Sequence, residues 1–374
     1  MDFELNDEQH MLRDAAGKAL ASDITKRNAI TATELGWSQD VWKQLAEMGV
    51  LGLPFAESDG GSGAGPIETM VVMTEIGRTL APEPYLDAVL VAGGLVAAAG
   101  TDAQRAAYLT RIAEGTVLLA LAHAEPGTRW PSAQVATTAK KTDDGWTLTG
   151  HKNPVLHGDC ADVLIVSASL PDGGVGLFLV DADATGVARK TYATHDGLRG
   201  AQVELTDAPG EQLGAGDATA AIVDSDVRAQ AALCAEAIGA MTEALRLTTD
   251  YLKQRKQFGV TLSTFQALTH RAADMYVALE LASSMSLYAN MSLADGVVDP
   301  IIASRAKLAV GRTARLIGQE AIQLHGGIGM TAEYAVGHYV SRLTAIGHTL
   351  GSTEDHLRVL TADVAGHEML TLTD

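Results

Sequence analysis

Cysteine is nearly absent from this chain. Its 374 residues contain two cysteines, Cys160 and Cys234, and no C-x-x-C pair. A disulfide framework needs several paired cysteines and a zinc site needs closely spaced ligands, so the sequence predicts neither. We expect both thiols to be buried as small apolar side chains.

Positive charge is also scarce. Lys and Arg number 27 against 46 Asp and Glu, which gives a formal net charge of -19. Such a surface repels the phosphates of nucleic acids and the headgroups of anionic membranes, so we expect neither as a partner. A local basic pocket for an anionic small molecule is compatible with this balance.

Long apolar runs and a basic leader are missing too. The start MDFELNDEQ carries acidic residues where a signal peptide has a basic flank and an apolar stretch. No later run reaches the roughly 18 apolar residues of a membrane span. We therefore expect a cytoplasmic protein without a membrane segment.

Several common catalytic motifs are absent as well. The chain has no G-x-x-x-x-G-K-[ST] loop, no H-E-x-x-H and no G-x-S-x-G. The glycines of HGGIGM at 325–330 do not follow an expected strand, so a Rossmann turn is not favoured. Four histidines near the C-terminal end lack a helical ligand spacing backed by carboxylates, so no metal site is predicted. They are His325, His338, His348 and His356.

Apolar residues, in contrast, make up 47% of the chain, enough for a well-buried core. Residues 8–115 follow a helical pattern, short β-rich runs separated by turn residues come next, and the helical period returns from Thr219. Helices and strands in separate blocks predict an α+β fold without alternating βαβ units. We expect an α-helical domain at 1–115, a β-barrel-like domain at 116–218 and a helical bundle at 219–374.

Two stretches stand out for the chemistry of their side chains, YLKQRKQFGVTLSTFQ at 251–266 and QLHGGIGM at 323–330. The first places a guanidinium, amides and an aromatic ring at the end of a long helix, a set suited to gripping a pyrophosphate and stacking on adenine. The second combines a glutamine with a bare Gly-Gly backbone, whose N–H groups can approach a phosphate closely. Taken singly, each stretch is better explained by a surface arginine or by helix-ending glycines.

Together, in this order and at this separation, the two stretches resemble the acyl-CoA dehydrogenase family of flavoproteins. The resemblance covers the whole chain. GWTLTGHK at 145–152 is similar to the family's dG-x-L-x-G-x-K strand, and VLGLPFAESDGGSGAG at 50–65 to its lGl…PeeyGG-x-G loop. The resemblance implies a helical N-terminal domain, a central antiparallel β domain and a C-terminal four-helix bundle. It also implies FAD as the cofactor and an acyl-CoA as the substrate.

In this family FAD lies across a subunit boundary. The β domain of one subunit holds the flavin ring, and the C-terminal helices of its neighbour hold the ADP half. The resemblance assigns the ADP half to residues that are all present in this chain. They are Arg255, Gln257, Phe258, Gln266, Gln323, Gly326 and Gly327.

The residues that would hold the flavin ring depart from the family pattern. TEP-x-x-GSD becomes AEPGTRWPS, which puts Ala124 at the position of a ring-binding threonine and places Trp130 and Pro131 in a loop of small residues. K-x-W-I-T-N-G becomes KNPVLHG, with Pro154 at the tryptophan position and Leu156 at a threonine position. Alanine and leucine offer no hydrogen bond to the ring, and a buried unpaired polar group costs about 1–3 kcal/mol. We expect a flavin to be poorly held here.

The catalytic base is missing at both positions that the family uses. Oxidation of an acyl-CoA needs a carboxylate that removes the α-proton while a hydride leaves the β-carbon. The family's Y-E-G-T turn aligns with LGST, which puts Gly351 at the glutamate position, or Leu350 after a one-residue slip. The alternative position, thirty residues before Gly259, is Ala229. No catalytic residue is therefore assigned to this chain.

Three functions remain open from the sequence. The first is the non-catalytic subunit of a heteromeric α2β2 acyl-CoA dehydrogenase, in which a homologous catalytic subunit supplies the glutamate and the ring pocket. Such enzymes are known in actinobacterial degradation of steroid side chains. The second is a self-sufficient dehydrogenase or oxidase whose base has moved to Asp226 or Glu354, although a displacement of about 1 Å can cost about 10²-fold in rate. The third is a non-enzymatic binding or scaffold protein with this fold.

Overall fold

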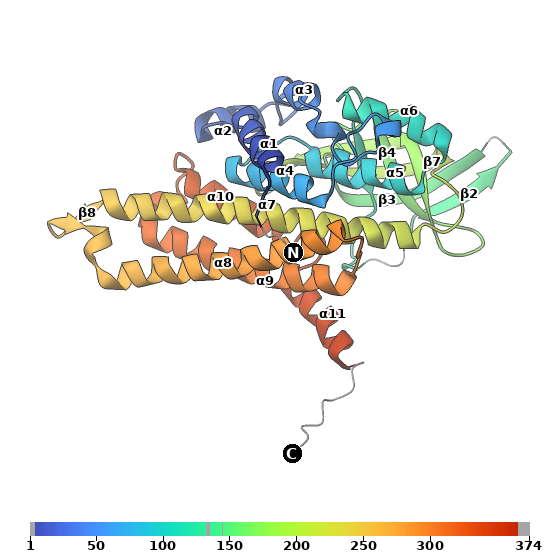
Figure 1. Cartoon of the computed structure of the whole chain (residues 1–374). Coiled ribbons are helices and arrows are strands. Elements are labelled where there is room, and N and C mark those ends of the chain that lie inside the picture. The colour runs from blue at the N-terminus through green and yellow to red at the C-terminus, as the bar shows by residue number, and fades with distance from the viewer. Residues whose placement is uncertain (1–3, 132–134, 144, 366–374) are drawn as a thin grey trace, which may run out of the picture.

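The computed structural model describes residues 4–131, 135–143 and 145–365. Helices come first, a β-sheet follows, and long helices complete the chain (Figure 1). The α+β class expected from the sequence is confirmed. No helix among these residues combines the length and the apolar character needed to cross a lipid bilayer.

The N-terminal helices begin at residues that satisfy free backbone N–H groups. Asn6 and Gln9 form a reciprocal capping box at the start of the first helix, and Thr101 and Gln104 form another. The helices of this part are α1 (Asp7–Ala19), α2 (Ile24–Thr31), α3 (Gln39–Glu47), α4 (Pro66–Thr79), the π-helix η3 (Tyr85–Gly93), α5 (Gly94–Ala99) and α6 (Asp102–Ala113).

The middle of the chain forms a seven-stranded sheet in the order β1-β4-β2-β3-β7-β5, with β6 against β7. Most pairings are antiparallel as expected, but β1 lies parallel to β4, with Leu119 opposite Val163. The strands are β1 (Leu119–Ala122), β2 (Thr138–Thr142), β3 (Gly145–Leu156), β4 (Val163–Ser169), β5 (Val175–Asp181), β6 (Val187–Ala193) and β7 (Arg199–Gln212). Apolar side chains inside this sheet form a core of their own.

The C-terminal part is built on α7, an unbroken helix of 36 residues that packs along α4 (Figure 1). Two glycines permit the close approach of these helices. A Cβ on Gly77 would lie 1.9 Å from the carbonyl oxygen of Glu236, and a Cβ on Gly239 would lie 1.9 Å from that of Thr74. The elements are α7 (Thr219–Gln254), β8 (Lys256–Gln257), β9 (Val260–Thr261), α8 (Gln266–Ala294), α9 (Pro300–His325), α10 (Ala335–Ile346) and α11 (Thr353–Ala365).

The two cysteines are free thiols in the described residues. Cys234 is buried in α7 as expected, whereas Cys160 is partly buried and donates to the carbonyl of His157 at 3.4 Å. Burial raises the pKa of both thiols to about 12, so neither is a reactive thiolate at neutral pH.

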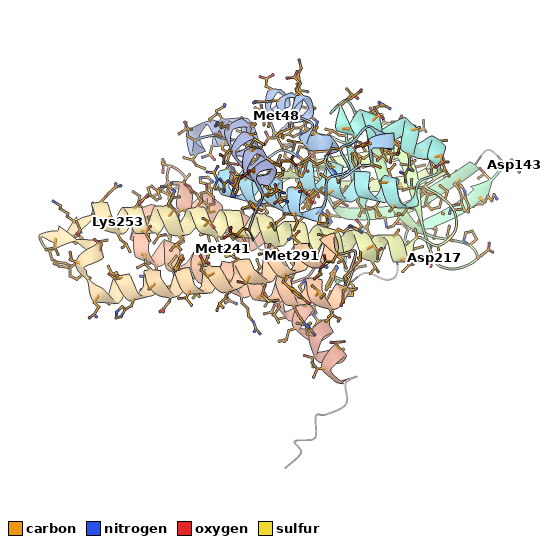
Figure 2. The ribbon with its side chains drawn as sticks, in the orientation of Figure 1. Met48, Asp143, Asp217, Met241, Lys253 and Met291 are labelled. Carbon is orange, nitrogen blue, oxygen red and sulfur yellow. The ribbon has the colours of Figure 1, made fainter. Side chains whose placement is uncertain are left out.

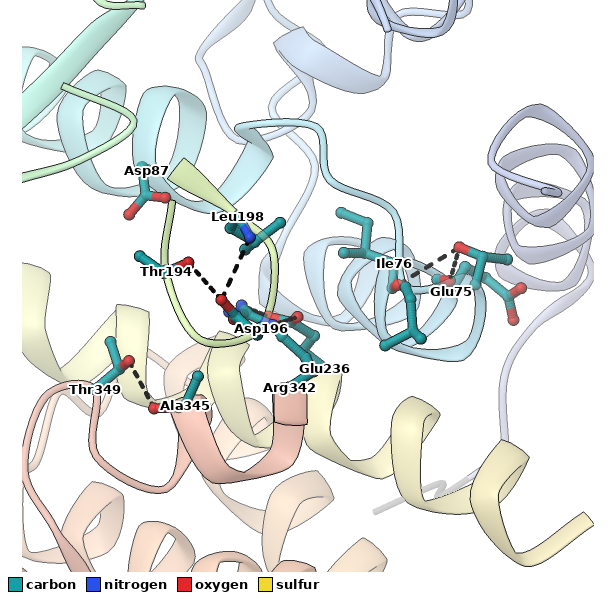
Figure 3. Close-up of polar contacts among 12 residues, drawn as sticks. Glu75, Ile76, Asp87, Thr194, Asp196, Leu198, Glu236, Arg342, Ala345 and Thr349 are labelled. Carbon is teal, nitrogen blue, oxygen red and sulfur yellow. Dashed lines mark hydrogen bonds and ion pairs between the residues drawn. The ribbon is translucent and has the colours of Figure 1, made fainter. Parts of the chain in front are cut away.

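One arginine ties the sheet to the long helices. Arg342 of α10 donates from Nε to Glu236 of α7 at 2.5 Å and from a terminal nitrogen to Asp196 at 2.7 Å. Asp196 lies in the turn between β6 and β7, and the close-up in Figure 3 shows Asp196, Glu236 and Arg342 gathered at one place. The Arg342 side chain is 13% exposed, so the three charges are largely removed from water. They fix where α10, and therefore the turn after it, lies against α7.

Replacement of Arg342 by alanine should destabilise the protein strongly, because it leaves Asp196 and Glu236 buried without a counter-charge. We expect the free energy of unfolding to fall by about 3–5 kcal/mol, measured by urea denaturation followed by circular dichroism. Arg246→Ala is the matched control, since Arg246 pairs with Glu243 and Asp250 on the exposed side of α7. It should cost about 1 kcal/mol or less. Equal losses in the two variants would contradict the assigned role of Arg342.

Candidate active site

A cavity of about 620 Å³ lies where the sheet, the beginning of α7 and the turn after α10 meet. Its wall combines segments that are far apart in the sequence. They are part of η3 (Leu86, Asp87 and Val91), Leu121 of β1, residues 123–130 after β1, Asn153, Pro154 and Leu156 of β3, Asp226 and Ala229 of α7, and residues 348–351. The wall is mostly apolar, with a few carboxyl, imidazole and amide groups among the lining side chains.

The loop after β1 is held by a buried ion pair. Lys152 of β3, which is 0% exposed, donates to Glu125 at 2.7 Å and to Ser167 at 3.0 Å. Burial lowers the pKa of Lys152 to about 8, against the opposing effect of Glu125. Burial alone would raise the pKa of Glu125, but hydrogen bonds from Lys152 and Thr137 outweigh it and lower the pKa to about 2. The pair is therefore ionised at neutral pH and keeps the loop against the sheet.

Both positions where a base was expected line this single cavity. Ala229 lies on α7 and is 3% exposed, and Gly351 lies in the turn between α10 and α11 with a φ of 100°. Neither residue carries a carboxylate. The structure thus brings Ala229 and Gly351 to the wall of one cavity.

The indole of Trp130 takes the space in front of Gly351. A Cβ on Gly351 would lie 2.5 Å from Cε3 of Trp130 and 2.8 Å from Nε2 of His356. The indole packs on the His356 ring with 4.5 Å between centroids, and its Nε1 donates to Asp226 at 3.0 Å. No side chain can extend from position 351 while this indole stays in place.

The two candidates for a displaced base lie in different places. Asp226 lines the cavity, and burial raises the pKa of its carboxyl to about 6 although the hydrogen bond from Trp130 lowers it. Glu354 does not line this cavity; it lines a second one of about 320 Å³ between α9 and α10. Of the two, only Asp226 has access to the candidate active site.

The cavity offers little to the polar edge of a flavin ring. Ala124, Pro154 and Leu156 all line it and have no side-chain donor. The carbonyl of Ala124 is already used, since it accepts the backbone N–H of Asn153 at 2.9 Å. The indole of Trp130 also takes up space at the wall of this cavity. These side chains do not fit the ring half of FAD.

The residues assigned to the ADP half gather at the other end of α7. Stacking of Tyr251 on His325, with 4.7 Å between ring centroids, brings the end of α7 beside the end of α9 and so joins the two sequence motifs. Arg255, Gln257, Phe258, Gln266, Gln323, Gly326 and Gly327 are all exposed. In the part of the chain that the structure describes, the guanidinium of Arg255 has no hydrogen-bond or ion-pair partner.

Open space surrounds the glycines of this set. A Cβ at Gly326 or Gly327 would meet no atom within 4 Å, and Phe258 is 91% exposed. Unpaired donors, a bare backbone and an uncovered ring fit a bound dinucleotide phosphate and base. The residues present therefore fit the ADP half of FAD.

The two half-sites are too far apart to hold the same cofactor. Ala229 lies on α7 and Arg255 directly follows the last residue of α7, 26 residues later, which at 1.5 Å per residue is about 40 Å. Figure 2 shows Asp217 just before α7 and Lys253 at its far end, next to the β8–β9 hairpin. A single FAD therefore cannot contact both Arg255 and the cavity beside Ala229.

Comparison with known proteins agrees with the geometry. Models of the N-terminal, middle and C-terminal domains of acyl-CoA dehydrogenases match residues 6–116, 120–207 and 228–365. Acyl-CoA dehydrogenase IpdE2 of Mycobacterium tuberculosis is 31% identical over 96% of this chain and 98% of its own length. The chain belongs to the acyl-CoA dehydrogenase family. FAD is the cofactor of this flavoprotein family.

Solved acyl-CoA dehydrogenases superpose along the whole chain. A structure described as the Tcur3481-Tcur3483 steroid ACAD has a TM-score of 0.87 at 31% identity, covering 96% of this chain and 98% of that one. The ChsE4-ChsE5 complex of Mycobacterium tuberculosis has a TM-score of 0.89 at 24% identity, covering 99% and 100%, and shows the shared fold.

Two contacts at the cavity were not foreseen from the sequence. The bond between Trp130 and Asp226 joins residues 96 positions apart. His157 bonds Asp87 of η3 at 2.7 Å and so fastens the end of β3 to the N-terminal helices. The sequence did show a bulky tryptophan in a loop where the family has small residues. That its indole would bond Asp226 depends on how α7 packs, which the sequence does not show.

Replacement of Asp226 by asparagine should make stability less dependent on pH. The folded pKa of about 6 lies above the ordinary 3.8, so ionisation of Asp226 destabilises the fold increasingly as pH rises from about 4 to above 6. Asp226→Asn should therefore be more stable than the original protein at pH 7.5, by about 3 kcal/mol, and equal to it at pH 4. Urea denaturation across this pH range measures the difference.

Asp224→Asn is the control, because Asp224 is exposed on the same helix. It should follow the original protein at every pH. The difference in free energy of unfolding between Asp226→Asn and the original protein should shrink as the pH falls. A difference that grows instead would show that the fold stabilises the ionised carboxyl, contrary to this account.

Proposed function

We propose that the chain is the non-catalytic subunit of a heteromeric, FAD-dependent acyl-CoA dehydrogenase. A homologous catalytic subunit supplies the glutamate and the flavin-ring pocket, and this chain supplies the ADP-binding residues, in an α2β2 assembly. The complex dehydrogenates an acyl-CoA thioester between its α and β carbons in the cytoplasm. We also propose that the chain consists of three domains, at 1–115, 116–218 and 219–374.

One observation carries the proposal. Ala229 and Gly351, the two places from which family members present a base, line the same cavity, and neither has a carboxylate. Gly351 alone is an ordinary variation, because members that use the helix position often have glycine in the turn. The loss of both removes general-base catalysis at either position from this chain.

The exposed ADP-binding set supports a role in a partner's site. Arg255 has a planar guanidinium that matches a pyrophosphate, and its neighbours Lys253 and Lys256 are exposed as well. This basic end contrasts with the chain's net charge of -19. It attracts an anionic dinucleotide without making the rest of the surface attractive to polyanions.

The chemistry is divided between the chains. FAD, when bound, supplies the acceptor for the hydride that leaves the β-carbon. In this chain Arg255 neutralises the pyrophosphate, Gly326 and Gly327 let main-chain N–H groups approach it, and Phe258 covers the adenine. These contacts hold and orient the cofactor, whereas removal of the α-proton requires the partner's carboxylate.

The substrate class is taken from relatives. The solved relative is a steroid acyl-CoA dehydrogenase with the paired designation Tcur3481-Tcur3483. At 31% identity over nearly the whole chain, this relative supports a bulky acyl-CoA, such as the CoA ester of a steroid side chain, and a heteromeric enzyme.

A self-sufficient enzyme with Asp226 as its base is the second candidate. The pKa of about 6 would suit a base at neutral pH, and the carboxyl lines the cavity. However, one of its oxygens accepts the indole N–H of Trp130 at 3.0 Å, and aspartate is one methylene shorter than glutamate. The first proposal needs no rearrangement of this contact and is therefore preferred.

Co-expression tests the proposal. The chain is produced alone and together with each acyl-CoA dehydrogenase homologue of the same organism in turn, and flavin absorbance and acyl-CoA-dependent dye reduction are recorded. We expect activity only in the pair. Arg255→Ala in this chain should weaken FAD binding by the pair about 10- to 100-fold, since a hydrogen bond to a charged group contributes about 1.5–3 kcal/mol.

Lys256→Ala is the matched control, because Lys256 is the adjacent exposed cation and lies outside the assigned set. It should change FAD affinity less than threefold. Yellow, active protein from this chain alone would refute the proposal and favour a base at Asp226. A pair without flavin would favour the scaffold function.

A further inference from the structure

We propose that Trp130 is a plug that closes this chain's own cavity to the thioester end of an acyl-CoA. This inference rests on the proposed function and adds to it. Loss of the base explains why the chain does not catalyse, whereas the plug explains why its cavity does not compete with the partner's site for substrate.

The position of the indole is the first argument. Cε3 and Cδ2 of Trp130 lie 2.5 Å and 3.0 Å from where a Cβ on Gly351 would be. In the family a base at this position faces the α-carbon of the acyl group. The indole therefore takes the space of a side chain at position 351 and stands beside the place where the thioester and its α-carbon would have to lie.

The indole is held on two sides. Its Nε1 donates to Asp226 on α7, and its ring packs on His356 of α11. His356 is 0% exposed, and burial lowers its pKa to about 4, so the ring is neutral at pH 7. Nε2 then donates to the carbonyl of Leu350 at 3.0 Å, and Nδ1 accepts from Ser304 at 3.2 Å.

The turn behind the indole is braced as well. The buried ammonium of Lys307 on α9 donates to the carbonyls of Ile346 at 2.7 Å and Thr349 at 2.8 Å. Leu350 and Gly351 have φ angles of 54° and 100°, a backbone form that these hydrogen bonds keep in place. Neither the turn nor His356 can yield to make room for a ligand without breaking several buried contacts.

Removal of the ring should open the cavity. In the co-expressed complex, Trp130→Ser replaces the indole by a side chain of the size that the family has in this loop. The probe is a thioether analogue of an acyl-CoA, which binds without turnover, titrated by isothermal calorimetry. We expect about one equivalent per heterodimer for the unaltered complex and about two for Trp130→Ser.

Trp130→Phe distinguishes the effect of the ring's bulk from that of the hydrogen bond to Asp226. It keeps an aromatic ring but loses the N–H that donates to Asp226. It should still bind about one equivalent. A second equivalent in Trp130→Phe would mean that the bond to Asp226, and not the bulk of the ring, closes the cavity, and this would overturn the plug.

A measurement on the unaltered side chain covers the case in which Trp130→Ser does not fold. The complex is labelled with 5-fluorotryptophan, and the ¹⁹F signal of Trp130 is assigned as the one missing from Trp130→Phe. Saturation with the analogue should leave this signal unshifted. A shift, or two equivalents bound by the unaltered complex, would show that ligand enters beside the indole and would refute the inference.

If the folded Trp130→Ser complex still bound only one equivalent of the analogue per heterodimer, the proposed role of Trp130 would also be refuted. Failure of the proposed function is detected separately, by activity of the chain alone or by an Arg255→Ala pair with normal FAD affinity. The two inferences can therefore fail independently.

Discussion

Arg342 lies between Glu236 of α7 and Asp196 of the sheet, and the geometry of the candidate site depends on these ion pairs. They fix α10 against both elements, and α10 leads directly into the turn that contains Gly351. A buried arginine with two carboxylates is costly to desolvate and strongly destabilising to break, so it specifies one arrangement. As a consequence, the loops of the sheet, α7 and the turn after α10 have fixed positions relative to one another and together form the cavity wall.

The helix α7 then separates two functions in space. Its beginning contributes Asp226 and Ala229 to a cavity that Trp130 fills in part, and its end presents Arg255 to solvent about 40 Å away. The cavity at the first end has Ala229 and Gly351 at the positions that the resemblance assigns to a base. The second end has every residue that the resemblance assigns to ADP. Under the proposed function, a chain with this distribution completes the cofactor site of another chain.

Much of this was accessible from the sequence, for identifiable reasons. The block order of helices and strands predicted the α+β class and the return of helices from Thr219, where α7 begins. The resemblance predicted that Ala229 and Gly351 stand at the two base positions of the family. That both residues line one cavity could be seen only in the structure. The bond from Trp130 to Asp226 and the parallel pairing of β1 with β4 were not predicted, because both depend on tertiary packing. The ADP-binding assignments and domain limits stay predictions.

The ratio of flavin to protein in the purified heteromer tests the central claim most directly. FAD released by denaturation is quantified by its absorbance, and each chain is quantified by amino-acid analysis. The account predicts one FAD for every two chains, because this chain grips the partner's cofactor and seats none in its own cavity. One FAD for every chain would contradict it, since the cavity beside Trp130 would then hold a flavin of its own.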